Sequence, residues 1–398
     1  MDNVDQFFKN SLFNVVRSLL SIGGLWPFHT LKRRCAIYFV IILILGSGFM
    51  FELLGTVDIL HDTFELIDSV PVFLFAVVNM FKLCYGIYTL PKIKLLLINM
   101  REYYLSSKSD EEVKIYNSHA LYARNFGFIY SCNHPVMFQV MTLVAKLNSK
   151  ESKENFTSSD TEYAAVKSGL AHPVNYMVDV DTYYVPIFIH TVVCEVGYTF
   201  LLVTFDVLYV TLIEHCCGLL EGLRYRLENA VNIEENDDLM FIQDKSYLNL
   251  VYSIQRYTET MQFVTIMESV FSLPLFVHIG CFIICLSTVG FQVITHTGNV
   301  HHLLKYYSYL NGLLINIFFE NWQGQKIIDS SEKVFNSAYN AEWYNMSNTT
   351  KKLLIMILMI SKKPLIFTIG KLFSLSYITF NSVMRTSMSY FMLLRSVQ

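Results

Sequence analysis

The sequence predicts an all-α polytopic membrane protein with seven transmembrane helices. Three observations support this fold class: the composition, the long apolar blocks and the distribution of basic residues. Of the 398 residues, 53% are hydrophobic and 16% are charged, whereas soluble domains average about 25% charged residues. The net charge of −3 gives no indication of nucleic-acid binding. Together these values exclude a soluble enzyme, a disordered protein and a disulfide-stapled secreted module.

Seven blocks of the sequence contain the roughly 20 apolar residues that a membrane-spanning helix requires. They run over Ala36–Leu54, Ser69–Leu90, Phe126–Leu147, Tyr184–Ile213, Phe263–Ile294, Leu303–Trp322 and Pro364–Leu394. The fourth and fifth blocks are longer than the hydrocarbon layer requires, so we expect them to tilt or to project beyond the bilayer. Residues 1–35 lack the apolar region of a cleaved signal peptide, so the first block is expected to act as a signal anchor.

The basic residues predict the orientation, because cytosolic loops carry an excess of Lys and Arg. Most of them lie on the predicted side of the N-terminus, in segments 1–35, 91–125, 215–262 and 323–363. The other side holds Lys150, Lys153, Lys167 and Arg395. The N-terminus is therefore predicted to be cytosolic and the C-terminus extracellular, the reverse of a G-protein-coupled receptor. Asn155, in the sequon Asn155-Phe156-Thr157, then lies outside and is a glycosylation candidate.

The cytosolic connections are themselves predicted to be partly helical. Within 215–262, leucines at 219, 220, 223 and 227 form the stripe of an amphipathic helix, and Lys351–Ile360 forms another short apolar helix. These helices predict a cytosolic layer whose apolar faces pack within the chain or against another subunit. The expected organisation is a cytosolic N-terminal segment (1–35), six transmembrane helices with cytosolic extensions (36–322), a cytosolic anchor segment (323–363), and a seventh helix with the extracellular C-terminus (364–398).

The seventh block carries a polar stripe at helical spacing. An α-helix turns by about 100° per residue. On such a helix, the residues that lie on the same side as Lys371 are Ser374, Ile378, Ser382, Arg385, Ser389, Leu393 and Ser396. A charged face is costly in lipid, so the stripe is expected to face protein or water. Several copies around an axis would enclose a pore, in which Leu393 forms a hydrophobic constriction that gates by dewetting.

An alternative interpretation keeps the stripe inside one chain. Lys371 and Arg385 would then pair with buried carboxylates, for which the candidates are Glu268, Asp206 and Glu320. Such a charge network would suit a transporter or a membrane enzyme. The sequence contains no HExxH, GxSxG or Walker motif, and no ligand set at metal-site spacing. Neither catalysis nor a cofactor is therefore expected.

The predicted outer halves of four spans are rich in aromatic and flexible apolar side chains with a few polar groups. Walls of this kind suit a small volatile or lipid-like ligand, although ordinary helix packing explains each residue equally well. The candidate ligand-binding residues are Val72, Phe75, Ala76, Asn79, Met137, Phe138, Met141, Ile187, Thr191, Tyr306 and Tyr309.

The C-terminal residues resemble the closing signature of insect odorant receptors. The resemblance rests on Lys363-Pro364-Leu365, on Gly370-Lys371 and on the final run Ser389-Tyr390-Phe391-Met392-Leu393-Leu394. It is dense from about Phe318 onward, and Leu25-Trp26-Pro27 fits the same family near the N-terminus. Gustatory receptors are the nearest alternative, but their Thr-Tyr…Gln-Phe ending is not matched.

The resemblance implies an odorant-tuned subunit of a ligand-gated, non-selective cation channel. The implied architecture is a tetramer in the plasma membrane of a sensory neuron dendrite, with the last helix of each subunit lining a central pore. The resemblance implies a gate at Leu393 and a polar pore position at Ser396, and the polar stripe adds Ser382, Arg385 and Ser389 as pore candidates. The short connection between the fourth and fifth spans differs from that of the co-receptor, which is therefore the implied partner. A volatile ligand would bind among spans two, three, four and six, chiefly at Tyr306 and Tyr309.

Overall fold

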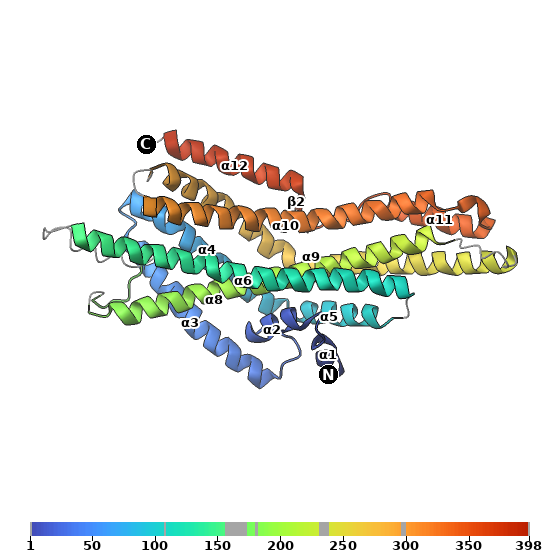
Figure 1. Ribbon diagram of the computed structural model, residues 1–398, viewed down its shortest axis with the longest axis horizontal. Helices are drawn as coiled ribbons and strands as arrows, with labels where there is room; N and C mark the ends of the chain where they lie inside the picture. Colours follow the sequence, from blue (N-terminus) through green and yellow to red (C-terminus); the bar gives the residue numbers. More distant parts are fainter. Residues whose placement is uncertain are drawn as a thin grey trace.

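The protein is an elongated bundle of long helices that lie side by side (Figure 1). The computed structural model describes residues 2–106, 109–155, 173–179, 182–230, 239–295 and 300–396. The helices are α1 (Asp2–Phe8), α2 (Asn14–Ile22), α3 (Leu31–Asp58), α4 (Thr63–Tyr88), α5 (Leu90–Leu105), α6 (Asp110–Asn155), α8 (Tyr184–Glu228), α9 (Leu239–Thr295), α10 (Val300–Asn340), the 3₁₀ helix η1 (Trp343–Asn345), α11 (Asn348–Ser361) and α12 (Tyr377–Ser396).

The all-α, seven-helix fold class is confirmed, since each of the seven predicted blocks overlaps one long helix: α3, α4, α6, α8, α9, α10 and α12. By length and composition alone, four helices in the described part of the chain are apolar enough to cross a membrane. These are α3, α4, α8 and α9. The remaining three carry more polar side chains, as expected of helices that turn polar faces toward protein or water.

Helix α8 is the centre of the bundle. Every residue of 201–220 is buried, and α8 packs against α2, α3, α4, α6, α9 and α10. A helix covered on all sides has no solvent or lipid face, which explains why its sequence is apolar all round. At the periphery, α3 exposes Phe39 and Leu43 by 69% and 61%, and these apolar side chains form a surface suited to lipid.

The predicted cytosolic layer is built mainly from the ends of the long helices. Helix α8 continues without a break to Glu228, α9 begins at Leu239 and α10 runs to Asn340, while α5 fills much of the predicted loop 91–125. The leucines at 220, 223 and 227 pack within the chain, against residues of α9, α10 and α11 such as Leu250, Val334 and Ile357. The leucine face at the end of α8 therefore packs within the chain, whereas α11 leaves Ile355, Met356 and Met359 exposed, and subunit contact there stays a prediction.

The prediction of a helix over Pro364–Leu394 is wrong in its first third. Residues Thr368–Ile369 (β1) and Phe373–Ser374 (β2) form an antiparallel hairpin, and α12 begins only at Tyr377. Gly370 and Lys371 adopt φ of 57° and 58°, a left-handed conformation that ends any helix here. A Cβ on Gly370 would also lie 2.7 Å from Phe276 of α9. The predicted stripe therefore loses Lys371 and Ser374.

A buried ion pair joins four helices at the level of the bundle centre. Lys82 of α4 is 1% exposed, and its Nζ lies 3.3 Å from Asp206 Oδ1 of α8 and 3.8 Å from Glu320 Oε1 of α10. His278 Nδ1 of α9 lies 2.9 Å from the same oxygen of Glu320. A buried charge is tolerated only with close opposite charges and hydrogen bonds.

Further hydrogen bonds complete the shell around Asp206. Tyr130 of α6 donates its hydroxyl to Asp206 Oδ2 at 2.7 Å. Asn316 of α10 donates to the Tyr130 oxygen at 2.8 Å and to Asp206 Oδ2 at 3.3 Å. Five helices (α4, α6, α8, α9 and α10) thus meet in one polar network inside an apolar bundle.

Replacing Lys82 with Met is expected to destabilise the fold by about 3–5 kcal/mol, because two carboxylates are left buried without their cation. The measurement is the thermal melting temperature in detergent. The control is Lys92→Met, which removes an exposed lysine from α5. Combining Lys82→Met with Asp206→Asn and Glu320→Gln should recover much of the loss. If Lys82→Met and Lys92→Met had equal melting temperatures, the pairing of Lys82 with Asp206 and Glu320 would not stabilise the fold.

Candidate functional site

Helix α12 lies at the edge of the bundle and packs chiefly on α9 and α10 (Figure 1). Its buried residues follow a four-residue spacing, which places them on one face of the helix. They are Thr379, Val383, Ser387 and Phe391. Ser287 Oγ of α9 donates to the Ser387 carbonyl at 3.0 Å, which fixes this face against α9.

The opposite face of α12 is exposed along its length. The predicted pore residues all lie on it as exposed side chains: Ser382, Arg385, Ser389, Leu393 and Ser396. Leu393 itself is 58% exposed. The polar stripe therefore exists on α12 from Ile378 to Ser396, and it is uncovered in the single chain.

The alternative pairings within one chain are largely wrong. Asp206 and Glu320 pair with Lys82 instead of with Arg385. Glu268 accepts a hydrogen bond from the Thr368 N–H at 3.2 Å, and its charge interacts with that of Lys371. Throughout the described ranges, no carboxylate lies within ion-pair distance of Arg385.

The two tyrosines expected to bind ligand lie on α10 against the first turns of α4. The Tyr306 hydroxyl donates to Asp68, which also accepts from Gln292 Nε2 of α9 at 3.1 Å. The Tyr309 hydroxyl donates to the Pro71 carbonyl at 3.0 Å. Tyr306 is 4% exposed. These hydroxyls are thus engaged within the protein and tie α4, α9 and α10 together.

The candidates on α4 and α8 lie on a neighbouring interface. Phe75 and Ala76 of α4 pack with Cys194 and Tyr198 of α8 in one apolar cluster. Two other candidates bond to their own helices: Asn79 donates to the Phe75 carbonyl at 2.8 Å and Thr191 to the Phe188 carbonyl at 2.9 Å. Val72 is half-buried and Ile187 is 3% exposed.

The candidates on α6 are not placed. Met137, Phe138 and Met141 belong to α6, but their side chains lie outside the described part of the structure. Asn155 is the last residue of α6, and the rest of its sequon also lies outside the described residues. Both expectations remain predictions.

The polar partners of these residues lie outside the set that the sequence predicts. Asp68 and Gln292 were not singled out, although both are polar groups inside or next to apolar blocks. Lys82 was also overlooked, although a lysine in the middle of an apolar span is itself a functional or structural signal. Charged residues are rare within apolar spans, and this rarity is the sequence signal that marks such positions.

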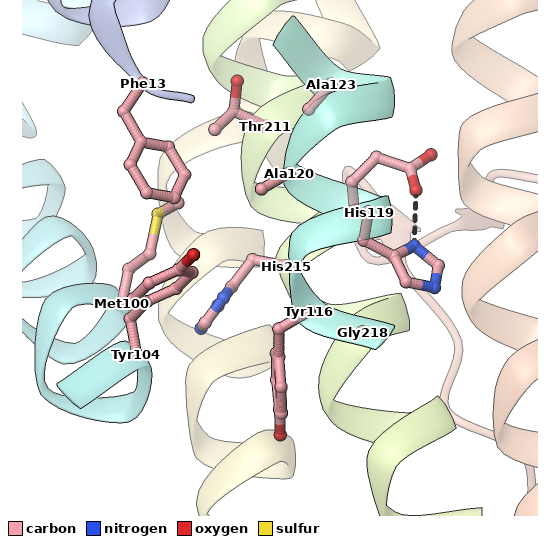
Figure 2. A pocket seen from close by; sticks show the side chains of 11 residues that line it. Phe13, Met100, Tyr104, Tyr116, His119, Ala120, Ala123, Thr211, His215 and Gly218 are labelled. Atoms are coloured by element: carbon pink, nitrogen blue, oxygen red, sulfur yellow. Dashed lines mark hydrogen bonds and ion pairs between the residues drawn. The ribbon is translucent and has the colours of Figure 1, made fainter. Parts of the chain in front are cut away.

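A small cavity lies elsewhere, between α5, α6, α8 and the start of α2 (Figure 2). Its volume is about 10 Å³, enough for a single water molecule and too small for an odorant. His119 Nδ1 on its wall lies 2.9 Å from Glu214 Oε2, and Glu214 also pairs with Lys326 of α10. This site shares no residue with the expected ligand-binding set.

Known proteins with similar sequences are odorant receptors. A family model described as 7tm Odorant receptor matches residues 62–388. Odorant receptor 67b of Drosophila melanogaster is 25% identical over 196 residues, which are 48% of this chain and 45% of that protein. Odorant receptor 10 of Aedes albopictus is 25% identical over 150 residues, 38% of this chain and 40% of that protein. The matched regions thus span less than half the length of each of these relatives.

The fold is similar to that of a solved olfactory receptor. The structure of OR5 from Machilis hrabei in complex with eugenol matches with a TM-score of 0.78 over 99% of this chain and 100% of that chain, at 13% identity. A second OR5 structure matches with a TM-score of 0.74 at 14% identity. At such low identity the likeness concerns the fold alone.

The packing role of Tyr306 leads to a stability prediction. Tyr306→Phe is expected to lower the free energy of unfolding by roughly 1–3 kcal/mol. The change keeps the ring but removes the hydroxyl that donates a hydrogen bond to the charged Asp68 carboxylate. The measurement is thermal melting in detergent. Tyr307→Phe is the matched control, since the neighbouring ring is 57% exposed. An equal effect of both changes would show that the Tyr306–Asp68 contact contributes little.

Proposed function

Because the chain belongs to the 7tm odorant receptor family, whose members are multi-pass membrane receptors, we propose that it is an odorant-tuned subunit of a ligand-gated, non-selective cation channel. The observation that carries this proposal is the uncovered polar face of α12. We further propose that a cytosolic N-terminus, an extracellular C-terminus and a location in the plasma membrane of a sensory neuron accompany this role.

The energetics of α12 favour a pore wall over a lipid contact. One face is buried against α9, while the other presents Ser382, Arg385 and Ser389 to the outside of the chain. Lipid offers no hydrogen bonds to hydroxyls or to a guanidinium, so this face requires water or another subunit. A ring of four subunits places it around a central aqueous path. The co-receptor is the proposed partner in that ring.

Leu393 supports a gate near the C-terminal end of α12. It is an exposed leucine on a face that carries Ser382, Arg385 and Ser389 together with the exposed apolar residues Ile378, Met388 and Met392. A narrow apolar ring expels water and thereby blocks ions without a physical plug. Ligand opens the pore only if it binds the state with the dilated ring more tightly than the closed state.

The ligand class follows from the candidate residues on α4, α8 and α10. The contacts of α4 with α8 and α10 combine apolar side chains such as Phe75 and Ala76 with Tyr306 and Tyr309, whose hydroxyls bond to Asp68 and to the Pro71 carbonyl and would exchange these partners for a ligand. Such walls suit a small volatile organic compound that has one polar group. For OR5 of Machilis hrabei, the bound compound is eugenol, which makes eugenol a reasonable first compound in a screen of this chain.

Whole-cell current during a screen of volatile compounds tests the proposal. We expect compound-evoked cation current from cells that express this chain with the co-receptor. Cells that express the co-receptor alone provide the control. Current in cells that express this chain alone would show that the co-receptor is not needed. If both proteins reach the surface and no compound of the panel evokes a current, the proposal is contradicted.

The gate leads to a separate prediction. Leu393→Ser is expected to raise the resting current of the pair several-fold, because a polar ring no longer expels water from the constriction. The matched control is Leu372→Ser, an exposed leucine in the hairpin before α12. An unchanged resting current at normal surface expression would refute the assignment of the gate to Leu393.

A further inference from the structure

The segment that supplies the proposed pore wall carries positive charge only. Residues 364–398 include Lys371, Arg385 and Arg395 and contain no Asp or Glu. Lys371 lies in the hairpin turn before the helix, so Arg385 and Arg395 are the charges on α12 itself, and both are exposed. Each copy of this chain therefore adds positive charge to the wall without a carboxylate of its own to balance it.

Arg385 lies at the centre of the exposed face. At about 100° per residue, its direction is opposite to the mean direction of the buried set, whereas Leu393 and Arg395 point about 80° to either side of it. The buried set is Thr379, Val383, Ser387 and Phe391. The eight residues from Arg385 to Leu393 correspond to about 12 Å along the helix axis. Arg385 thus lies on the pore stripe, roughly two turns below the proposed gate.

No carboxylate in the described part of the chain neutralises this charge. Among those residues Arg385 has no carboxylate within ion-pair distance, and the interior acids Asp206 and Glu320 are paired with Lys82. A guanidinium stays charged at every physiological pH. In an aqueous path, such a fixed charge repels cations and concentrates anions.

We propose that Arg385 determines the charge selectivity of the assembled channel by lowering the permeability of cations relative to anions. The inference rests on the proposed function, since it requires that α12 lines the pore. Each further copy of this chain around the axis adds another guanidinium at the same level. Strongly cation-selective conduction therefore requires partner subunits whose pore helices lack this charge.

The test is the reversal potential of the compound-evoked current under NaCl dilution, in patches from cells that express this chain with the co-receptor. The compound is the panel member that opens the wild-type pair. Arg385→Gln is expected to raise the ratio of sodium to chloride permeability by about twofold at 0.15 M salt. A unit charge roughly 8 Å from the ion acts on the cation and the anion in opposite directions, and screening over one Debye length reduces each effect to about a third of its value in pure water. The change should grow at low ionic strength, because the screening length increases from about 8 Å at 0.15 M to about 30 Å at 0.01 M.

Three further variants distinguish charge from structural damage. Arg385→Lys keeps the charge and is expected to keep the wild-type ratio. Lys92→Gln removes an exposed charge from α5, across the bundle from α12 (Figure 1), and should change nothing. Ser389→Lys adds a charge one turn along the same face and should lower the ratio, which tests the inference even if Arg385→Gln does not reach the surface.

The outcomes separate this inference from the proposed function. Normal currents with an unchanged permeability ratio in both Arg385→Gln and Ser389→Lys would overturn the role of Arg385 and leave the channel assignment intact. Absence of evoked current from the wild-type pair would overturn the proposed function, and this inference with it.

Discussion

Asp206 is the group on which the arrangement of the bundle depends. A carboxylate within the fully buried helix α8 is stable only if cations and hydrogen-bond donors surround it. Lys82, Tyr130 and Asn316 supply them from α4, α6 and α10. If any of these helices slid or rotated, a buried charge would lose its partners. Apolar contacts alone would allow small shifts of the helices. The network therefore sets the register of helices that are otherwise held by non-directional packing.

The same network explains why α12 can remain at the periphery. Lys82 pairs with both Asp206 and Glu320 from inside the bundle, so these interior acids have a cation partner other than Arg385. Helix α12 is attached through one face to α9 and α10, and through the hairpin whose Gly370 N–H donates to Ser272 of α9 at 2.9 Å. Its other face is then available for a function outside the single chain.

Helices α9 and α10 connect the two regions that the proposed mechanism requires. They carry Gln292 and Tyr306, which bond to Asp68 at one end of α4, and they also form the surface on which α12 packs. A ligand that altered the contacts around Asp68 would act on the helices that support the pore wall. This is a physically contiguous path, and coupling along it requires that ligand favour one of two arrangements of these helices.

Local periodicity alone predicts three features: the seven apolar blocks, the amphipathic leucines after residue 218 and the stripe from Ser382 to Ser396. Periodicity follows from the 3.6-residue repeat of a single helix, so it needs no knowledge of neighbours. Only the tertiary structure decided that Lys82 pairs with Asp206, 124 positions away, and that Tyr306 bonds to Asp68. It also decided that a hairpin replaces the start of the seventh helix, because contacts with Phe276 and Ser272 of α9 stabilise the left-handed turn at Gly370. Such outcomes depend on how distant helices pack, which no local pattern specifies.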